Sequence, residues 1–168
     1  MNLRLTLSFF FGVLYFSAIS CGTFGAQDDA SPATPHGEAV ATFAGGCFWC
    51  VESDFDHVAG VIRTISGYTG GNLVDPTYKQ VSMGGTGHLE AVQIFYNPRA
   101  INYETLLDIF WRSVDPTDEG GQFCDRGKSY ITGIFANSLE QKRLAESSKH
   151  GLAETGFLGQ PIVTLIEM

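Results

Sequence analysis

Apolar and polar residues follow regular patterns from residue 38 to the end of the chain. Short apolar or alternating runs that stop at glycine, proline or asparagine predict strands, and apolar residues three or four positions apart predict helices. The predicted strands cover residues 38–44, 61–68, 89–96, 130–136 and 161–167. The predicted helices cover residues 47–58, 103–114 and 138–154, the last with Ser138 as its cap and Gln141 in the capping-box position.

Two long stretches, residues 72–87 and 117–129, are rich in glycine or polar residues and show no clear element. Loops of this length in a compact domain are often functional. Strands and helices alternate elsewhere, without strict strand–helix–strand regularity. We therefore predict an α/β fold, in detail a two-layer α+β sandwich with a ferredoxin-like core and long functional loops gathered at one edge.

The composition is that of a folded domain. Hydrophobic residues make up 44% of the chain and charged residues 17%, which allows a packed core. The net charge of −8, from 18 acidic and 10 basic residues, disfavours nucleic acids and anionic membrane surfaces as partners.

The N-terminal residues have the pattern of an export signal. Residues 5–19 form an apolar run without charge, which is short for a spanning helix and typical of a signal peptide. We expect a signal peptide over residues 1–21, with an uncleaved N-terminal anchor as the alternative. Cys21 follows Ala-Ile-Ser and resembles a lipoprotein processing site, so it is a candidate for lipidation. Residues 22–37 are polar, with several glycines and prolines, and predict a flexible linker before a catalytic domain at residues 38–168.

The cysteines need an explanation. If Cys21 belongs to the leader, Cys47, Cys50 and Cys124 remain, an odd number for a purely structural disulfide framework. Cys47 follows two glycines between a predicted strand and a predicted helix. Free backbone N–H groups and the helix dipole favour an anion at that position, so this thiol should ionise more easily than a free cysteine.

Three interpretations of residues 47–50 (CFWC) are open. A zinc site is weakly supported, because zinc needs four ligands and no second C-x-x-C or paired histidine motif exists, although His88 and Cys124 could complete a set. A thioredoxin-type dithiol oxidoreductase carries this motif between a strand and a helix. Against it, two bulky aromatics fill the middle positions and no following cis-proline segment is obvious. The third interpretation is a nucleophilic Cys47 assisted by other thiols.

Separated motifs then follow one another along the domain. They are GGCFWCVE at residues 45–52, SGYTGG at 66–71, PTYKQV at 76–81, TGHLEAV at 86–92 and DPTDEGGQFCDRGKSY at 115–130. Together they resemble the A-type peptide methionine sulfoxide reductases, over residues 40–167. Several motifs in one order are much more specific than a single C-x-x-C. The resemblance implies an enzyme that reduces methionine-(S)-sulfoxide to methionine in proteins, in peptides or as the free amino acid.

The resemblance also implies roles for single residues. Cys47 would attack the sulfoxide sulfur and be left as a sulfenic acid. Glu90 would protonate the departing oxygen, since an acid on an apolar strand is partly desolvated and keeps its proton more strongly. Strand alternation alone favours a surface glutamate there instead. The remaining matches are Tyr78 and Tyr130 for hydrogen bonds to the sulfoxide oxygen, Asp125 for ordering the site, and Phe48 and Trp49 for an aromatic wall around the substrate methyl group.

The sulfenic acid must then be resolved. Many relatives carry a C-terminal tail, sometimes with a resolving cysteine, whereas this sequence ends at Met168, and we expect that tail to be lacking. Cys50, one helical turn from Cys47, is the favoured resolving thiol, with Cys124 as the alternative. Ile131 follows Tyr130 where the family commonly has arginine, which puts efficiency in question.

The resemblance implies neither a metal nor an organic cofactor, and a thioredoxin-like dithiol protein as the external reductant. We expect a monomer in the periplasm, or lipid-anchored at the cell envelope through Cys21, that repairs oxidised proteins. Two alternatives stay open. A general thiol–disulfide oxidoreductase would give Glu90, Tyr78 and Tyr130 no role, and an inactive truncated module would bind the sulfoxide without turnover.

Overall fold

The computed structural model describes residues 37–168. The predicted signal peptide at residues 1–21, the candidate lipidation site at Cys21 and nearly all of the predicted linker at residues 22–37 lie outside the described residues. Within the described part, no helix combines the length and the apolar character needed to cross a bilayer.

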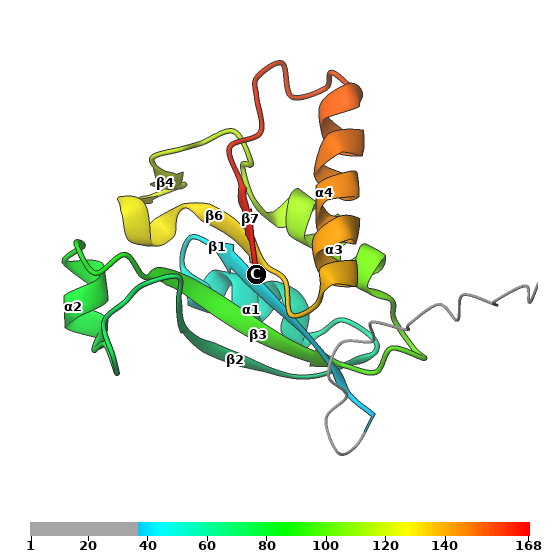
Figure 1. The fold of residues 1–168 in the computed structure, drawn as a ribbon, viewed down its shortest axis with the longest axis horizontal. Helices are drawn as coiled ribbons and strands as arrows, with labels where there is room; N and C mark the ends of the chain where they lie inside the picture. The colour runs from blue at the N-terminus through cyan, green and yellow to red at the C-terminus, as the bar shows by residue number, and fades with distance from the viewer. Residues whose placement is uncertain (1–36) are drawn as a thin grey trace, which may run out of the picture.

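A five-stranded sheet forms the centre of the domain (Figure 1). Its order is β2-β3-β1-β6-β7, and every neighbouring pair is antiparallel except the parallel pair β6 and β7. The strands are β1 (Ala39–Gly45), β2 (Val61–Thr69), β3 (Leu89–Tyr96), β6 (Thr132–Phe135) and β7 (Leu165–Glu167).

The long helices lie together on one side of this sheet. Helix α1 (Phe48–Asp56) packs on β1, β2 and β3, and α3 (Tyr103–Ser113) packs on β1. Helix α4 (Leu139–Glu154) packs on α3 and β7, and stands at the right of the sheet in Figure 1. The succession β1-α1-β2-β3-α3-β6 with sheet order β2-β3-β1-β6 is the ferredoxin-like arrangement, so the predicted fold class is confirmed.

The main core fills the space between the sheet and the helices. Phe43 on β1 lies at its centre, with ring centroids 5.7 Å from Phe55 of α1 and 5.0 Å from Phe110 of α3. Residues 92 and 94 of β3 are fully buried on the same side as Phe43. Because successive strand residues point to opposite faces, Glu90 belongs to this buried face. The interpretation of Glu90 as a surface glutamate, which alternation favoured, is therefore wrong: the side chain is 2% exposed.

The structure adds short elements where the sequence predicted only loops. Helix α2 (Tyr78–Ser82) lies within residues 72–87. The two-residue strands β4 (Gly121–Gln122) and β5 (Asp125–Arg126) and the 3₁₀ turn η1 (Lys128–Tyr130) lie within residues 117–129. Strand β6 starts two residues later than predicted, because residues 128–130 form that turn. Strand β7 starts at Leu165 rather than at residue 161.

One predicted cap is half correct. The Ser138 side chain accepts the Gln141 N–H as expected, but the Gln141 side chain accepts from Asn137 and donates to the Val40 carbonyl. Gln141 thus ties α4 to β1 instead of closing a capping box. A reciprocal capping box does exist at α2, between Thr77 and Gln80.

Candidate active site

Cys47 occupies the N-cap of α1, as the sequence predicted. Strand β1 ends at Gly45, the chain turns at Gly46 with φ of +88°, and the Cys47 carbonyl accepts the first helical N–H groups, from Cys50 at 3.0 Å and Val51 at 3.2 Å. The turn requires glycine, since a Cβ at Gly46 would lie 2.6 Å from the Cβ of Gln122. The glycines thus allow the chain to pass close to Gln122 of β4 and to present Cys47 at the helix start.

The buried acid of the site is Glu90. Its Oε2 accepts the backbone N–H of Phe48 at 3.1 Å, so the carboxyl lies against the first residue of α1. Its Oε1 has no hydrogen-bond partner among the described residues. Burial raises the pKa of Glu90 above its usual 4.5, the nearby charge of Asp125 raises it further, and the bond from Phe48 opposes both. The result is an acid that retains its proton more strongly than an exposed glutamate and has one oxygen free.

Two tyrosines, Tyr68 and Tyr130, lie near Glu90, and Tyr78 lies near both of them. Tyr68 is paired directly opposite Glu90 in the register of β2 and β3. The pKa values of Tyr68 and Tyr130 are raised, first by burial and then by the charge of Glu90, so both hydroxyls remain donors. The neighbouring Tyr78 hydroxyl also contributes to the raised pKa of Tyr130. Tyr68 was not among the residues singled out from the sequence, although it belongs to the SGYTGG motif. Its cross-strand partner becomes visible only once the strands are paired.

Aromatic rings extend from this group to the surface. Phe48 is buried, and its ring centroid lies 5.3 Å from Trp49, 5.8 Å from Tyr68 and 6.2 Å from Tyr78. Trp49 and Tyr78 are stacked at 6.3 Å with an interplanar angle of 18°, and are 63% and 50% exposed. The predicted wall residues are thus in contact, and the ring of Tyr78 joins them. Their faces offer an apolar surface that solvent can reach.

The three cysteines of the described part are free thiols. Cys50 lies one turn along α1 from Cys47, and its N–H donates to the Cys47 carbonyl at 3.0 Å. The pKa of Cys50 is raised by partial burial of its sulfur, by the neighbouring Cys47 thiol, and by the charges of Cys47, Asp125 and Asp54. Cys50 therefore keeps its proton beside the Cys47 sulfur. Cys124 lies exposed in the turn between β4 and β5.

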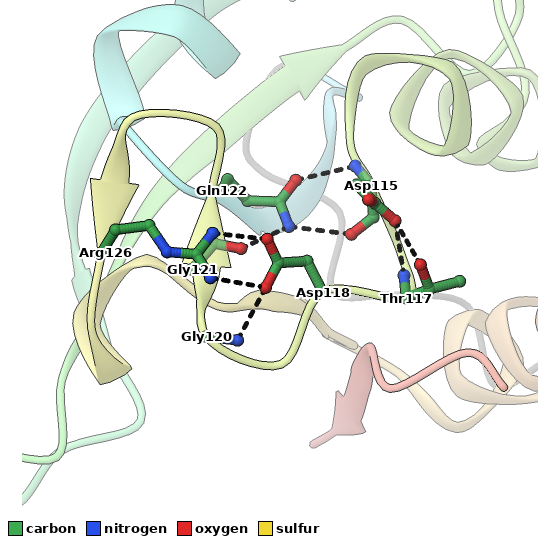
Figure 2. A network of polar contacts seen from close by, with 7 residues as sticks. All are labelled: Asp115, Thr117, Asp118, Gly120, Gly121, Gln122 and Arg126. Atoms are coloured by element: carbon green, nitrogen blue, oxygen red, sulfur yellow. Dashed lines mark hydrogen bonds and ion pairs between the residues drawn. The ribbon is translucent and has the colours of Figure 1, made fainter. Parts of the chain in front are cut away.

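A polar network fixes the loop that carries Asp125 (Figure 2). The buried Gln122 side chain accepts the Asp115 N–H and donates to the Asp115 and Gly121 carbonyls, each at 2.8 Å. Arg126 pairs with Asp118 through both of its terminal nitrogens. Because Gln122 also packs against Gly46, this network supports the turn that presents Cys47.

The loop that carries Tyr78 is attached at fewer points. The buried Ser129 hydroxyl donates to the Val81 carbonyl at 2.8 Å, which joins η1 to α2. His88 Nε2 lies 2.9 Å from the Leu73 carbonyl, in keeping with a supporting role for this histidine. No cluster of three or more His, Cys, Asp or Glu side chains suited to a metal ion occurs within residues 37–168.

The site combines a thiol at a helix start with a buried carboxyl, phenol hydroxyls and aromatic faces. On a ferredoxin-like fold, this combination indicates an enzyme that uses a thiol in its chemistry. A family model described as peptide methionine sulfoxide reductase matches residues 39–168. The chain is 54% identical over 129 residues to the peptide methionine sulfoxide reductase MsrA of Bacillus pumilus, covering 77% of this chain and 72% of that one. It is 54% identical over 125 residues to MsrA of Bacillus subtilis, covering 74% and 71%.

Solved structures of methionine sulfoxide reductases also match this chain. Mxr1 from Saccharomyces cerevisiae in its reduced form matches with a TM-score of 0.74 and 31% identity, over 80% of this chain and 77% of that one. Methionine sulfoxide reductase A of Corynebacterium diphtheriae matches with a TM-score of 0.69 and 30% identity, over 79% of this chain and 66%, just under two thirds, of that one. The chain therefore belongs to the peptide methionine sulfoxide reductase family, whose enzymes reduce methionine sulfoxide. The predicted A type and enzyme class are confirmed.

Proposed function

We propose that this chain reduces methionine-(S)-sulfoxide, in proteins, in peptides and as the free amino acid, with Cys47 as the nucleophile. The Cys47 sulfur attacks the sulfoxide sulfur, the S–O bond breaks and methionine leaves. The oxygen stays on Cys47 as a sulfenic acid, so the substrate sulfur is reduced and the cysteine sulfur is oxidised. The observation that carries the proposal is the buried Glu90 carboxyl bonded to the backbone of Phe48, the residue next to Cys47.

Glu90 donates the proton that the sulfoxide oxygen needs. Burial raises the pKa of Glu90, and its Oε1 has no partner in the described part of the chain, which supports a bond to the substrate. The hydroxyls of Tyr78 and Tyr130 hydrogen-bond the same oxygen, and Tyr68 adds a third. Asp125 orders this end of the site.

The aromatic wall binds the other side of the substrate. Phe48 and Trp49 hold the methyl group on sulfur against their flat apolar faces. Their ring contact at 5.3 Å and the exposure of Trp49 support this role, because a side chain arriving from solvent can lie on the wall without moving buried residues.

Cys50 resolves the sulfenic acid. Its sulfur attacks the Cys47 sulfur, a Cys47–Cys50 disulfide forms, and the thiol proton leaves with the oxygen as water. The nearness of the two residues, with the Cys50 N–H donating to the Cys47 carbonyl at 3.0 Å, supports this choice over Cys124. Because the pKa of Cys50 is raised, its thiol must give up its proton as it attacks. Replacing Cys50 with Ser should stop turnover with a dithiol reductant while Cys124→Ser keeps it. The reverse result would assign the step to Cys124.

An external dithiol then reduces the disulfide, and no metal or organic cofactor takes part. A thioredoxin-like protein suits this step. Mxr1, whose reduced form is 31% identical to this chain, has also been solved in complex with Trx2. We assign the reaction to the periplasm or the cell envelope, on oxidised proteins, with the enzyme as a monomer. The apolar run at residues 5–19 supports export, and Cys21 is a candidate lipid anchor.

The test is conversion of dabsyl-labelled methionine sulfoxide by the purified chain with dithiothreitol. The S epimer should be converted, the R epimer should not, and a Cys47→Ser variant should be inactive. Binding of the S epimer without product would favour a binding module. Reduction of a protein disulfide without sulfoxide conversion would favour a general thiol–disulfide oxidoreductase.

A further inference from the structure

The turn between β4 and β5 holds an aromatic residue in an unusual conformation. Gly121 pairs with Arg126 and Gln122 with Asp125, so Phe123 and Cys124 form a two-residue hairpin turn. Phe123 has φ of +50°, in the left-handed region that favours glycine in such turns. Its side chain is 72% exposed. The backbone is strained here, and burial of the ring returns little of that cost.

This turn lies at the rim of the active site. Gln122, on one side of Phe123, packs against Gly46, the residue before Cys47. Asp125, on the other side, is close enough for its charge to raise the pKa values of both Glu90 and Cys50. Phe123 is therefore held between a residue that supports the nucleophile and a residue that faces the acid.

The support beneath the turn is rigid. The strands that carry the turn are fixed by the three Gln122 hydrogen bonds and the Arg126–Asp118 pair (Figure 2). The Gly127 N–H bond to the Gly120 carbonyl, at 2.8 Å, adds to them. Strain that the surrounding structure maintains, at an exposed apolar ring beside reacting groups, indicates a binding role.

We propose that Phe123 contacts the polypeptide around the oxidised methionine and packs on an apolar side chain next to it. This inference rests on the proposed function. The substrate sulfur reaches the site from solvent, where exposed Trp49 and Tyr78 form the outer part of the aromatic wall. The turn at Phe123 borders the same site through Gln122 and Asp125. An apolar side chain next to the oxidised methionine would bury area against the Phe123 ring and so gain affinity.

The experiment follows single turnovers of the reduced full chain, without added reductant, on three substrates. They are N-acetyl-methionine sulfoxide, an acetylated Gly-Met(O)-Gly amide and an acetylated Leu-Met(O)-Leu amide. The unaltered chain should prefer the leucine-flanked peptide. Phe123→Ala should lower its second-order rate constant for that peptide about fivefold to tenfold, and leave the other two rates unchanged.

Two further variants separate contact from folding. Phe123→Gly removes the ring but relieves the strained φ, so it should lose the same peptide preference while unfolding at no lower urea concentration than the unaltered chain. Phe157→Ala removes another exposed aromatic, 88% exposed and in the segment after α4, and should change none of the three rates.

Several outcomes would overturn the proposal. An equal loss on all three substrates would mean that Phe123 orders the Cys47 turn. Unchanged single turnovers with slower thioredoxin-supported turnover would mean that the ring contacts the reductant instead. Failure of the proposed function is distinguishable from both, since the unaltered chain would then convert none of the three substrates.

Discussion

Two loops enclose the active site, and the molecule holds them by different means. The loop at residues 115–127 is fixed by a dense polar network around Gln122, which is 1% exposed. The loop at residues 70–88 contains α2, a helix of five residues whose only buried side chain is Val81. The first loop is secured by several buried hydrogen bonds, and the second by fewer bonds, chief among them the one from Ser129 to the Val81 carbonyl.

The difference in how firmly the two loops are held corresponds to the parts of the site that they carry. The network loop backs the Gly46 turn and so the position of Cys47, where small displacements affect the chemistry directly. The α2 loop carries Tyr78, half exposed and stacked on Trp49, at the entrance. A site of this construction keeps the reacting thiol fixed and lets the outer wall adjust to the polypeptide. Loops with few buried contacts are the ones that open locally at low free-energy cost.

The largest expected effect is at Glu90, which lies near Asp125 of the first loop and near Tyr130 of η1. Glu90→Gln keeps the acceptor for the Phe48 N–H but removes the proton donor. We expect single-turnover sulfoxide reduction to fall by about a hundredfold to ten-thousandfold, the range of general acid catalysis. A fall below about tenfold would assign the proton to another group, and the tyrosines would be the first candidates.

Glu90→Gln should lower activity, but it should raise stability relative to the unaltered chain at neutral pH. Burial raises the pKa of Glu90 above 4.5 in the folded state, so the folded protein binds this proton more tightly than the unfolded chain. Its favourable contribution to the free energy of unfolding is complete below pH 4.5 and is lost as the pH rises through the raised pKa. As the pH rises through the raised pKa, the free energy of unfolding measured in urea should therefore fall for the unaltered chain and not for Glu90→Gln. Parallel pH profiles would contradict the raised pKa.

The next effect tests the rigid loop. Gln122→Ala leaves the Asp115 N–H, the Asp115 carbonyl and the Gly121 carbonyl without the amide that pairs them. We expect the free energy of unfolding to fall by about 3 kcal/mol, since buried polar groups without partners are costly. Turnover should fall as well, because the Gly46 turn loses its support. Urea unfolding and sulfoxide reduction measure the two losses.

Gln80→Ala is the matched control in the other loop. It removes an exposed glutamine that closes the capping box of α2, and should cost less than about 1 kcal/mol. Equal losses for the two variants would remove the distinction between a rigid loop and a tethered one.

The sequence predicted the parts of the fold that depend on periodicity. Strand β3 matches residues 89–96, and the order of strand, glycine turn and helix correctly gave the N-cap position of Cys47. The short elements α2, β4 and β5 were missed because they have no apolar period. Long-range bonds such as that from Ser129 to Val81 hold them, and such bonds do not show in a local pattern.

Some side chains of the site could likewise be predicted from the sequence, and others could not. The order of elements predicted Cys47 at a helix start, but the polar character of Glu90 was misleading, because Glu90 shares the buried face of Val92. Leu89 and Ala91, on the opposite face, are buried as well. Where a strand is buried on both faces, as at residues 89–92, the pattern does not show which side faces solvent. The place of Tyr68 beside Glu90 depends on strand pairing, which one sequence does not contain.

The smallest expected effect tests the tethered loop. Ser129→Ala removes the hydroxyl that donates to the Val81 carbonyl, while the Gly84 N–H still bonds to that carbonyl at 2.9 Å. We expect a loss of about 1 kcal/mol or less in global stability, because no carbonyl is left unpaired. Hydrogen exchange at residues 78–82 should nevertheless become faster, and KM for a sulfoxide peptide should rise more than kcat falls.

Ser82→Ala is the control for that variant. It removes a hydroxyl that bonds only to Lys79 within α2, and should change neither exchange nor KM. If Ser129→Ala lowered kcat with KM unchanged, the hydroxyl would be positioning Tyr130 for the chemistry rather than holding α2 at the entrance. The two loops would then belong to one rigid unit, and the outer wall would have no freedom to adapt to different protein substrates.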